Sequence, residues 1–311
     1  MQKILDPRND IVFKMYFSRE KNKFLLISFL ESVLMPPVPI ADVKFLNEQL
    51  TKDYVDEKAS ILDLVVSFKD GTRCDIEMQM APTANFRKRL LYYWSKLHRD
   101  QIKTGEDYHK LMPTISIAIL NYVEFKNAPD SVHTIFELRE KDSHELYLPD
   151  LELHFLELPK LHAWTKRGEL KYDKMKKWMD FFKMKDDKTS FLKLQEDTIM
   201  SKAVDALEEL SLDPEAQNLA EMREKARINF QIVTQGAYDE GVEKGLEKGR
   251  EEGREEGREE GREEGREKGL ETGKIENQKN IISLMLKKGM SLEQVADLLE
   301  LDPGEIEKIL K

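Results

Sequence analysis

The sequence has a single cysteine, Cys74, among its 311 residues. One thiol excludes an intramolecular disulfide and is typical of proteins that stay in a reducing compartment. The longest mostly apolar stretches, Phe24–Leu30 and Thr114–Val123, are far shorter than the ~20 residues that a membrane-spanning helix needs. The first residues also lack the apolar core of a secretion signal. We therefore expect a cytoplasmic protein with no membrane-spanning segment.

Several common chemistries have no signature in the chain. The six histidines show no metal-ligand spacing such as H-E-x-x-H, which argues against a zinc site. The 50 Lys and Arg residues against 60 Asp and Glu give a net charge of −10. This balance argues against a uniformly basic nucleic-acid-binding surface, but it leaves local basic patches open.

Composition divides the chain into four segments. Residues 1–160 mix apolar runs, turn signals and aromatic residues, as a packed α/β core does, and residues 161–235 have a helical pattern. Residues 236–274 repeat tetrads of Gly, Arg and Glu, which favour either a charged helix or a linker. Residues 275–311 contain three short helical patterns, the second of which starts with a capping box at Ser291. This spacing predicts a small helix-turn-helix-like module.

The first segment is expected to contain two helices, three strands, a helix and a buried strand, in that order. The first helix is expected after a candidate cap at Asp10, with its apolar positions between Ile11 and Phe17. The other expected helices and strands are 21–34, 42–50, 60–68, 73–80, 84–103 and 114–123, with further strands near 133–139, 144–148 and 151–158. The order predicts an antiparallel hairpin joined by a helical crossover to a buried strand.

Two acidic residues lie inside apolar strand patterns. Asp63 lies in the strand expected at 60–68, and Glu77, followed by Gln79, lies in the strand expected at 73–80. A carboxylate in a buried strand is costly unless it is paired or binds a cation. Two of them on neighbouring strands suit a hard divalent ion such as Mg²⁺. The alternative is that Asp63 pairs with a basic side chain while Glu77 and Gln79 face solvent.

The hairpin register determines whether these side chains meet. A two-residue loop at Asp70–Gly71 would place Asp63 opposite Met78 and turn Glu77 to the other face. A three-residue loop at Asp70–Thr72 pairs Lys69 with Arg73 and Asp63 with Gln79, and it gathers the apolar residues on one face. We therefore expect the three-residue loop.

Three stretches of the chain resemble the PD-(D/E)XK nuclease family transposases, also described as recombination-promoting nucleases. They are DPRNDIVFKMYF (6–17), DEKASILDLVVSFKDGTRCDIEMQM (56–80) and FRKRLLYYWSKLHRDQIKTGEDYHKLMPTISIAIL (86–120). The resemblance implies a restriction-endonuclease-like fold, a mixed sheet flanked by helices, and metal-dependent cleavage of DNA phosphodiesters. It implies that Asp63, Glu77 and the main-chain carbonyl of Met78 hold Mg²⁺ or Mn²⁺.

One residue departs from the family name, which denotes Lys at the third motif position, where this chain has Gln79. Gln does not titrate, so it acts on water or phosphate only through hydrogen bonds. The resemblance therefore implies that Asp63, Glu77 and Gln79 form the catalytic set, with the missing cation supplied elsewhere. Candidates that would contact DNA phosphates are Lys14, Lys58, Arg87 and Arg89. Asp10 is either a further acidic site residue or a helix cap.

The sequence thus predicts an Mg²⁺-dependent DNA endonuclease linked to recombination or mobile elements. The alternative is a catalytically weak or inactive DNA-binding or assembly protein that keeps the nuclease fold. Residues 160–178, with seven basic against two acidic residues, are expected to add an electropositive surface for DNA. The tetrad repeat is expected to mediate homo-oligomerisation or to remain a solvated charged helix.

Overall fold

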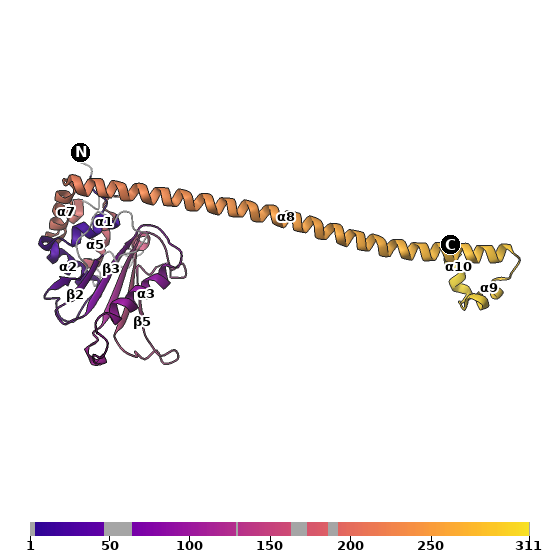
Figure 1. Cartoon of the computed structure of the whole chain (residues 1–311), viewed down its shortest axis with the longest axis horizontal. Coiled ribbons are helices and arrows are strands. Elements are labelled where there is room, and N and C mark those ends of the chain that lie inside the picture. Colours follow the sequence, from indigo (N-terminus) through magenta and orange to yellow (C-terminus); the bar gives the residue numbers. More distant parts are fainter. Residues whose placement is uncertain (1–3, 47–63, 129, 163–172, 186–191, 311) are drawn as a thin grey trace. The chain divides into compact units, whose positions relative to one another are not determined.

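The computed structural model describes residues 4–46, 64–128, 130–162, 173–185 and 192–310. These residues divide into two compact units, 1–229 and 230–311. The first unit contains a six-stranded mixed sheet flanked by helices (Figure 1). The chain therefore has the expected α/β, restriction-endonuclease-like architecture, followed by a long charged helix.

The strands have the order β1-β2-β3-β4-β6-β5 across the sheet. The hairpin strands β1, β2 and β3 are antiparallel, β3, β4 and β6 are parallel, and β5 returns antiparallel to β6. Their bounds are β1 Val43–Phe45, β2 Leu64–Phe68, β3 Arg73–Gln79, β4 Thr114–Leu120, β5 His133–Glu137 and β6 Leu151–Glu157. The strand expected at 144–148 is not formed, because only one isolated bridge, between Arg139 and Leu146, joins this segment to its neighbour.

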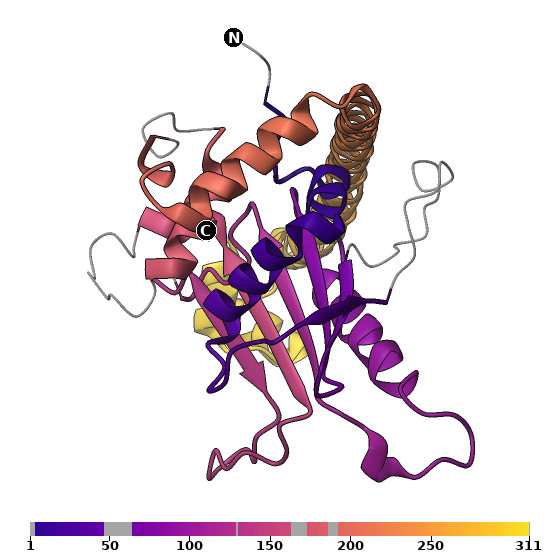
Figure 2. The same cartoon turned by 90° about the vertical axis from the view of Figure 1, so that its left-hand side faces the viewer.

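The helices of the first unit lie on both faces of the sheet (Figure 2). Their bounds are α1 Asp10–Phe17, α2 Lys23–Leu34, α3 Phe86–Arg99, α5 Asp173–Lys183, α7 Thr198–Ser211 and the first turns of α8 Pro214–Lys287. Helices α1, α2, α5 and α7 share one large apolar core with the sheet, with Trp178 of α5 packed among the rings of Phe17 and Phe29. Helix α3 covers the opposite face, where Phe86 and Leu90 pack against β4 and β6.

The β2–β3 hairpin has the predicted faces but a different register. Ser67 pairs with Arg73, and the amide of Phe68 donates to the carbonyl of Thr72 over 2.8 Å. The three-residue loop is therefore 69–71, not 70–72, and the expected pairing of Lys69 with Arg73 is wrong by two residues. Gly71 determines the loop position because its φ of 96° is strained for any residue with a Cβ. An even shift leaves every side chain on its predicted face.

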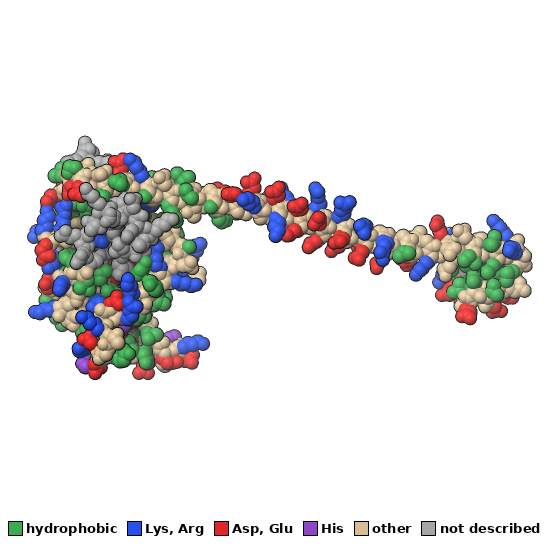
Figure 3. Space-filling view, viewed as in Figure 1, with side chains coloured by type: hydrophobic (Ala, Val, Ile, Leu, Met, Phe, Trp, Pro, Cys, Tyr) green, Lys and Arg blue, Asp and Glu red, His purple; other side chains and the backbone are tan. Residues whose placement is uncertain are grey.

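The second unit consists of most of α8 and two short helices, α9 Leu292–Leu299 and α10 Pro303–Leu310. Ser291 caps α9 through the predicted capping box with Gln294. Ile282 at the end of α8 packs with Val295 of α9 and Ile306 of α10 in a small apolar core. The tetrad repeat belongs to the continuous helix α8, along which acidic and basic side chains alternate (Figure 3).

Candidate active site at the carboxyl end of two parallel strands

The side chains of β3 alternate between the two faces of the sheet. Cys74, Ile76 and Met78 belong to the large apolar core, so Glu77 and Gln79 lie on the opposite face, the one that α3 covers. Glu77 is only 2% exposed. The predicted polar face of β3 is therefore covered by protein rather than by solvent, which contradicts the expectation that Glu77 simply faces water.

Glu77 lies among groups that both favour and oppose its charge. The side-chain amide of Gln79 donates to Oε2 of Glu77 over 3.4 Å. Burial raises the pKa of the Glu77 carboxyl, while the positive charge of Arg89 on α3 and the hydrogen bond from Gln79 lower it. The net pKa lies above its usual range. Such a carboxylate is stabilised when a cation binds beside it.

The described candidates for DNA contact have different surroundings. Lys58 and the predicted metal ligand Asp63 lie outside the described residues. Lys14 is buried in α1, with 4% of its surface exposed. Arg87 pairs with Glu124 at 2.5 Å, and its guanidinium lies 4.7 Å from the centre of the Phe125 ring.

Arg89 differs from Arg87 because its charge acts directly on Glu77. Its guanidinium lies 5.4 Å from the centre of the Phe86 ring in the same helical turn. Of the two α3 arginines named from the sequence, Arg89 is thus the one that the fold brings to Glu77.

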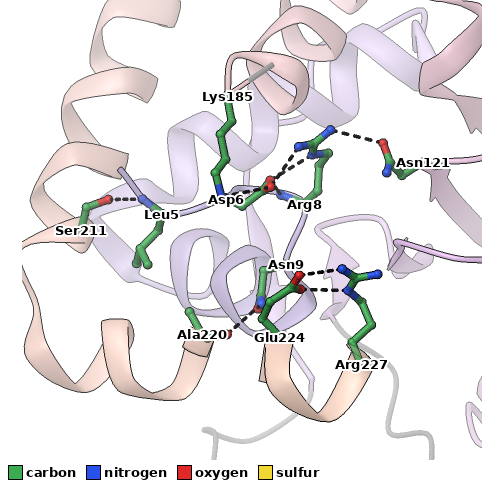
Figure 4. Close-up of polar contacts among 10 residues, drawn as sticks. All are labelled: Leu5, Asp6, Arg8, Asn9, Asn121, Lys185, Ser211, Ala220, Glu224 and Arg227. Atoms are coloured by element: carbon green, nitrogen blue, oxygen red, sulfur yellow. Dashed lines mark hydrogen bonds and ion pairs between the residues drawn. The ribbon is translucent and has the colours of Figure 1, made fainter. Parts of the chain in front are cut away.

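The N-terminal motif 6–10 stabilises the end of the sheet next to Gln79. Arg8 forms a bidentate ion pair with Asp6, and its Nη1 donates to Asn121 Oδ1 over 3.4 Å (Figure 4). The amide of Asn121 in turn donates to the carbonyl of Gln79 over 2.9 Å. Lys185 lies 3.6 Å from Asp6. This network fixes the turn that follows β4.

The same motif determines the role of Asp10. Asn9 caps α1, because its Oδ1 accepts the amides of Ile11 and Val12 (3.1 and 3.3 Å). Asp10 is the first residue of the helix and forms an ion pair with Arg223 of α8, with 2.7 Å between Nε and Oδ2. The helix-cap role considered for Asp10 therefore belongs to Asn9.

Three lysines in the described part of the basic stretch 160–178 pair with acidic residues, while Lys174 is exposed. Lys160 is 3% exposed and donates to the buried carboxylate of Glu157 over 2.6 Å. Lys176 pairs with Asp180, and Lys177 pairs with Asp173 and Asp197. The count of charges within 160–178 did not include Glu157, Asp180 and Asp197. These acidic residues largely neutralise the three lysines.

Two polar residues near α3, Tyr122 and Thr83, were not identified from the sequence. Tyr122 follows β4 and packs against the apolar cluster under α3, and its hydroxyl and the hydroxyl of Thr83 are buried without a hydrogen-bond partner among the described residues. One signal was available for Tyr122. It follows directly after a buried parallel strand, and ligands of α/β sheets bind at the carboxyl ends of such strands.

The oxygen donors at this position suit a hard cation. Glu77 contributes a carboxylate and Met78 a main-chain carbonyl, and Mg²⁺ and Mn²⁺ prefer such oxygen ligands. In the part of the chain that the structure describes, no three His, Cys, Asp or Glu residues gather as a metal site. The third expected ligand, Asp63, lies outside that part. No described helix combines the length and apolar character needed to cross a membrane.

Comparison with models of known protein families gives a match. The sequence model of a family described as PD-(D/E)XK nuclease family transposase matches residues 7–237. The match includes the whole sheet, α3 and the first turns of α8. No curated protein and no solved structure matches the chain.

Proposed function

The chain belongs to the PD-(D/E)XK nuclease family transposases, and from this premise we propose that it is a metal-dependent DNA endonuclease linked to recombination or mobile elements. Family membership supports a nuclease-like function linked to transposition, and nucleases of this family generally use divalent metals. The observation that carries the proposal is a buried carboxylate, Glu77, beside an amide and an arginine at the carboxyl end of parallel strands.

Asp63, Glu77 and the main-chain carbonyl of Met78 would hold Mg²⁺ or Mn²⁺. Such an ion supplies positive charge to a phosphoryl oxygen and lowers the pKa of a water molecule bound to it. A group of three oxygen donors leaves further coordination positions for water and phosphate, as Mg²⁺ sites usually do.

Gln79 would orient the attacking water rather than deprotonate it. Its side-chain nitrogen is engaged with Oε2 of Glu77, which leaves the amide oxygen to accept a hydrogen bond from water. An amide has no titratable proton in this range, so it does not replace the basic function of Lys. The positive charge of Lys is instead available from Arg89, which already interacts with Glu77.

Cleavage of supercoiled plasmid in Mg²⁺ or Mn²⁺ tests the proposal. We expect wild-type protein to nick or linearise the plasmid, and Asp63→Ala and Glu77→Gln to lose that activity at least a hundredfold, the size of effect seen when a key group is removed. Glu137→Gln is the matched control, because Glu137 is an exposed strand carboxylate on β5. Equal cleavage by wild type and Glu77→Gln would contradict the site assignment.

The second candidate function is a DNA-binding or assembly protein with little or no turnover, which Gln79 in the Lys position favours. Calorimetric titration with Mn²⁺ separates the two. If the site is a nuclease site, the wild type should bind Mn²⁺ and the Glu77→Gln variant should not. If the chain is only an assembly protein, neither form should bind the ion.

We also propose that α8 mediates association with a second copy of the chain. Tyr238, Val242 and Leu246 recur at four-residue steps and are 66, 51 and 57% exposed. Glycines also recur every four residues, one position before the apolar residues at Gly241 and Gly245, and those further along, such as Gly253 and Gly257, have no atom within 4 Å of where a Cβ would lie. The glycines leave room for a second helix at close range, and burial of Tyr238, Val242 and Leu246 favours association.

A further inference from the structure

The first turn of α3 carries an unusual charge distribution. Arg87, Lys88 and Arg89 are basic, and the turn contains no acidic residue. The preceding residue, Asn85, has a left-handed conformation (φ 60°) and makes no side-chain capping hydrogen bond in the described structure. The N-terminus of a helix carries partial positive charge, so cations are unfavourable there and anions are favourable. This turn therefore favours an anionic ligand.

A second, independent observation concerns buried polar atoms at the same corner. Thr83 Oγ1, Arg89 Nε and Tyr122 Oη are all buried and have no hydrogen-bond partner among the described residues. The carbonyl of Thr83 accepts the amide of Phe86 over 3.3 Å. The Phe86 ring contacts the Arg89 guanidinium, and it belongs to the apolar cluster against which Tyr122 packs. Thr83 and Arg89 are thus both linked to Phe86, and Tyr122 packs against the apolar cluster that contains Phe86.

All three atoms are available as hydrogen-bond donors. Arg89 is a permanent cation, and the hydroxyl of Thr83 carries a proton that rotates freely. Burial, with the negative charge of Glu124 adding to it, raises the pKa of Tyr122 above its usual range, so the phenol keeps its proton. Buried donors without acceptors are rare in folded proteins. A ligand that offers several oxygen acceptors and a negative charge satisfies all three.

The position of these donors relative to Glu77 indicates which anion they bind. Arg89 acts electrostatically on both Glu77 and Tyr122, and Glu77 acts on Tyr122. Arg89 and Tyr122 therefore lie near the carboxylate assigned to the metal. A phosphodiester has two non-bridging oxygens that accept hydrogen bonds, and phosphate oxygens receive most protein–DNA hydrogen bonds.

We propose that Arg89, Tyr122 and Thr83 bind the non-bridging oxygens of a DNA phosphodiester at the N-terminus of α3, beside Glu77. The inference rests on the proposed endonuclease function and deepens it. Arg89 supplies the charge that Gln79 lacks, and the two hydroxyl groups orient the phosphate. Arg87 is not part of this site because Glu124 already neutralises it.

The test is binding of a short fluorescent DNA duplex in Ca²⁺, measured over a range of salt concentrations. We expect Arg89→Met to weaken binding about tenfold to a hundredfold, as loss of a charge-assisted hydrogen bond does, and to reduce the slope of log K against log salt by about 0.9. Tyr122→Phe should weaken binding at unchanged slope. Arg89→Lys should keep the slope while losing affinity, and it serves as the conservative variant if Arg89→Met folds poorly.

Matched controls are Arg87→Met and Tyr92→Phe, since Tyr92 is a 63% exposed tyrosine on the same helix. A second measurement uses cleavage of substrates with a stereospecific phosphorothioate. Wild type should prefer one diastereomer, and Tyr122→Phe should reduce that preference, which a merely structural role would leave unchanged.

The outcomes separate this inference from the proposed function. If wild type cuts DNA and Glu77→Gln does not, while Arg89→Lys and Tyr122→Phe bind and cut as wild type does, the phosphate site is overturned and the nuclease stands. If wild type cuts nothing in any metal but Arg89→Met and Tyr122→Phe still weaken duplex binding, the phosphate site stands and the nuclease falls.

Discussion

Lys160 and Glu157 form an ion pair of 2.6 Å inside the protein, with 3% and 0% of their side chains exposed. The second oxygen of Glu157 accepts the amides of Glu124 and Phe125, and Lys160 also donates to the carbonyls of Phe125 and Ala128. The pair thus fixes the segment that follows β4, in which Tyr122 lies. Its role is to position this segment rather than to contact DNA.

We expect Lys160→Met to destabilise the protein by about 3–5 kcal/mol, because it leaves the Glu157 carboxylate buried without its counter-ion. Urea unfolding followed by circular dichroism measures the change. Adding Glu157→Gln should restore part of the stability, since Gln keeps an oxygen acceptor for the amides. The exposed pair Lys110–Glu106 provides the control, and Lys110→Met should change stability far less, because solvent screens an exposed ion pair. Equal effects of the two lysine substitutions would contradict the buried-pair argument.

Gly71 in the β2–β3 loop should be harder to replace than Gly105 in the segment after α3. Its φ is 96°, and an added Cβ would lie 2.9 Å from Cγ of Met112. Gly105 has a similar φ of 88° but no atom within 4 Å of the Cβ position. Gly105→Ala should therefore cost only the backbone strain, about 1–2 kcal/mol, and Gly71→Ala should cost more because it adds the contact with Met112. Unfolding midpoints of the two variants test this difference, and an equal loss would mean that Met112 moves aside.

His133 should make stability depend on pH. Its Nε2 lies 2.9 Å from His154 Nδ1, and Nε2 of His154 lies 3.0 Å from Glu152. Burial, followed by the charge of His154, lowers the pKa of His133 from 6.5 to about 3. Between these values the unfolded chain binds more protons than the folded protein, so stability decreases as pH falls below 6.5.

We expect His133 to lower the free energy of unfolding by about 2 kcal/mol when the pH falls from 7 to 5. His133→Gln should reduce this pH dependence, which denaturant unfolding at several pH values measures. His144→Asn is the control, because His144 is exposed and Asn tolerates its positive φ. An unchanged pH dependence in His133→Gln would show that other groups cause it.

Replacing glycines of the α8 repeat distinguishes a solvated single helix from a helix that contacts a second copy of the chain. In a solvated single helix, replacing Gly253, Gly257 and Gly261 by Ala should stabilise the helix by about 1 kcal/mol per residue, because no atom occupies the Cβ positions. If the glycines contact a second α8, the same substitutions should weaken the oligomer. Sedimentation equilibrium of the full chain and its thermal unfolding distinguish the two. An oligomer of unchanged affinity would exclude the glycines from the interface.

Local patterns were sufficient to predict much of the fold. Alternation along 73–80 predicted β3 and its two faces, and the apolar run from Thr114 predicted β4, because side chains of a strand alternate and buried strands are apolar on both faces. The capping box at Ser291 predicted the start of α9. The hairpin register was predicted with the correct faces but shifted by two residues, since burial distinguishes odd from even shifts only.

By itself, the sequence determined the order of the elements, the polar face that carries Glu77 and Gln79, and the family. The tertiary structure decided which charges remain available: it buried Lys160 against Glu157, paired Arg87 with Glu124 and brought Arg89 to Glu77. It also brought Tyr122 to the apolar cluster under α3. The physical reason is that the energy of a charge depends on its burial and on neighbours distant in sequence, whereas strand and helix patterns depend on residues a few positions apart.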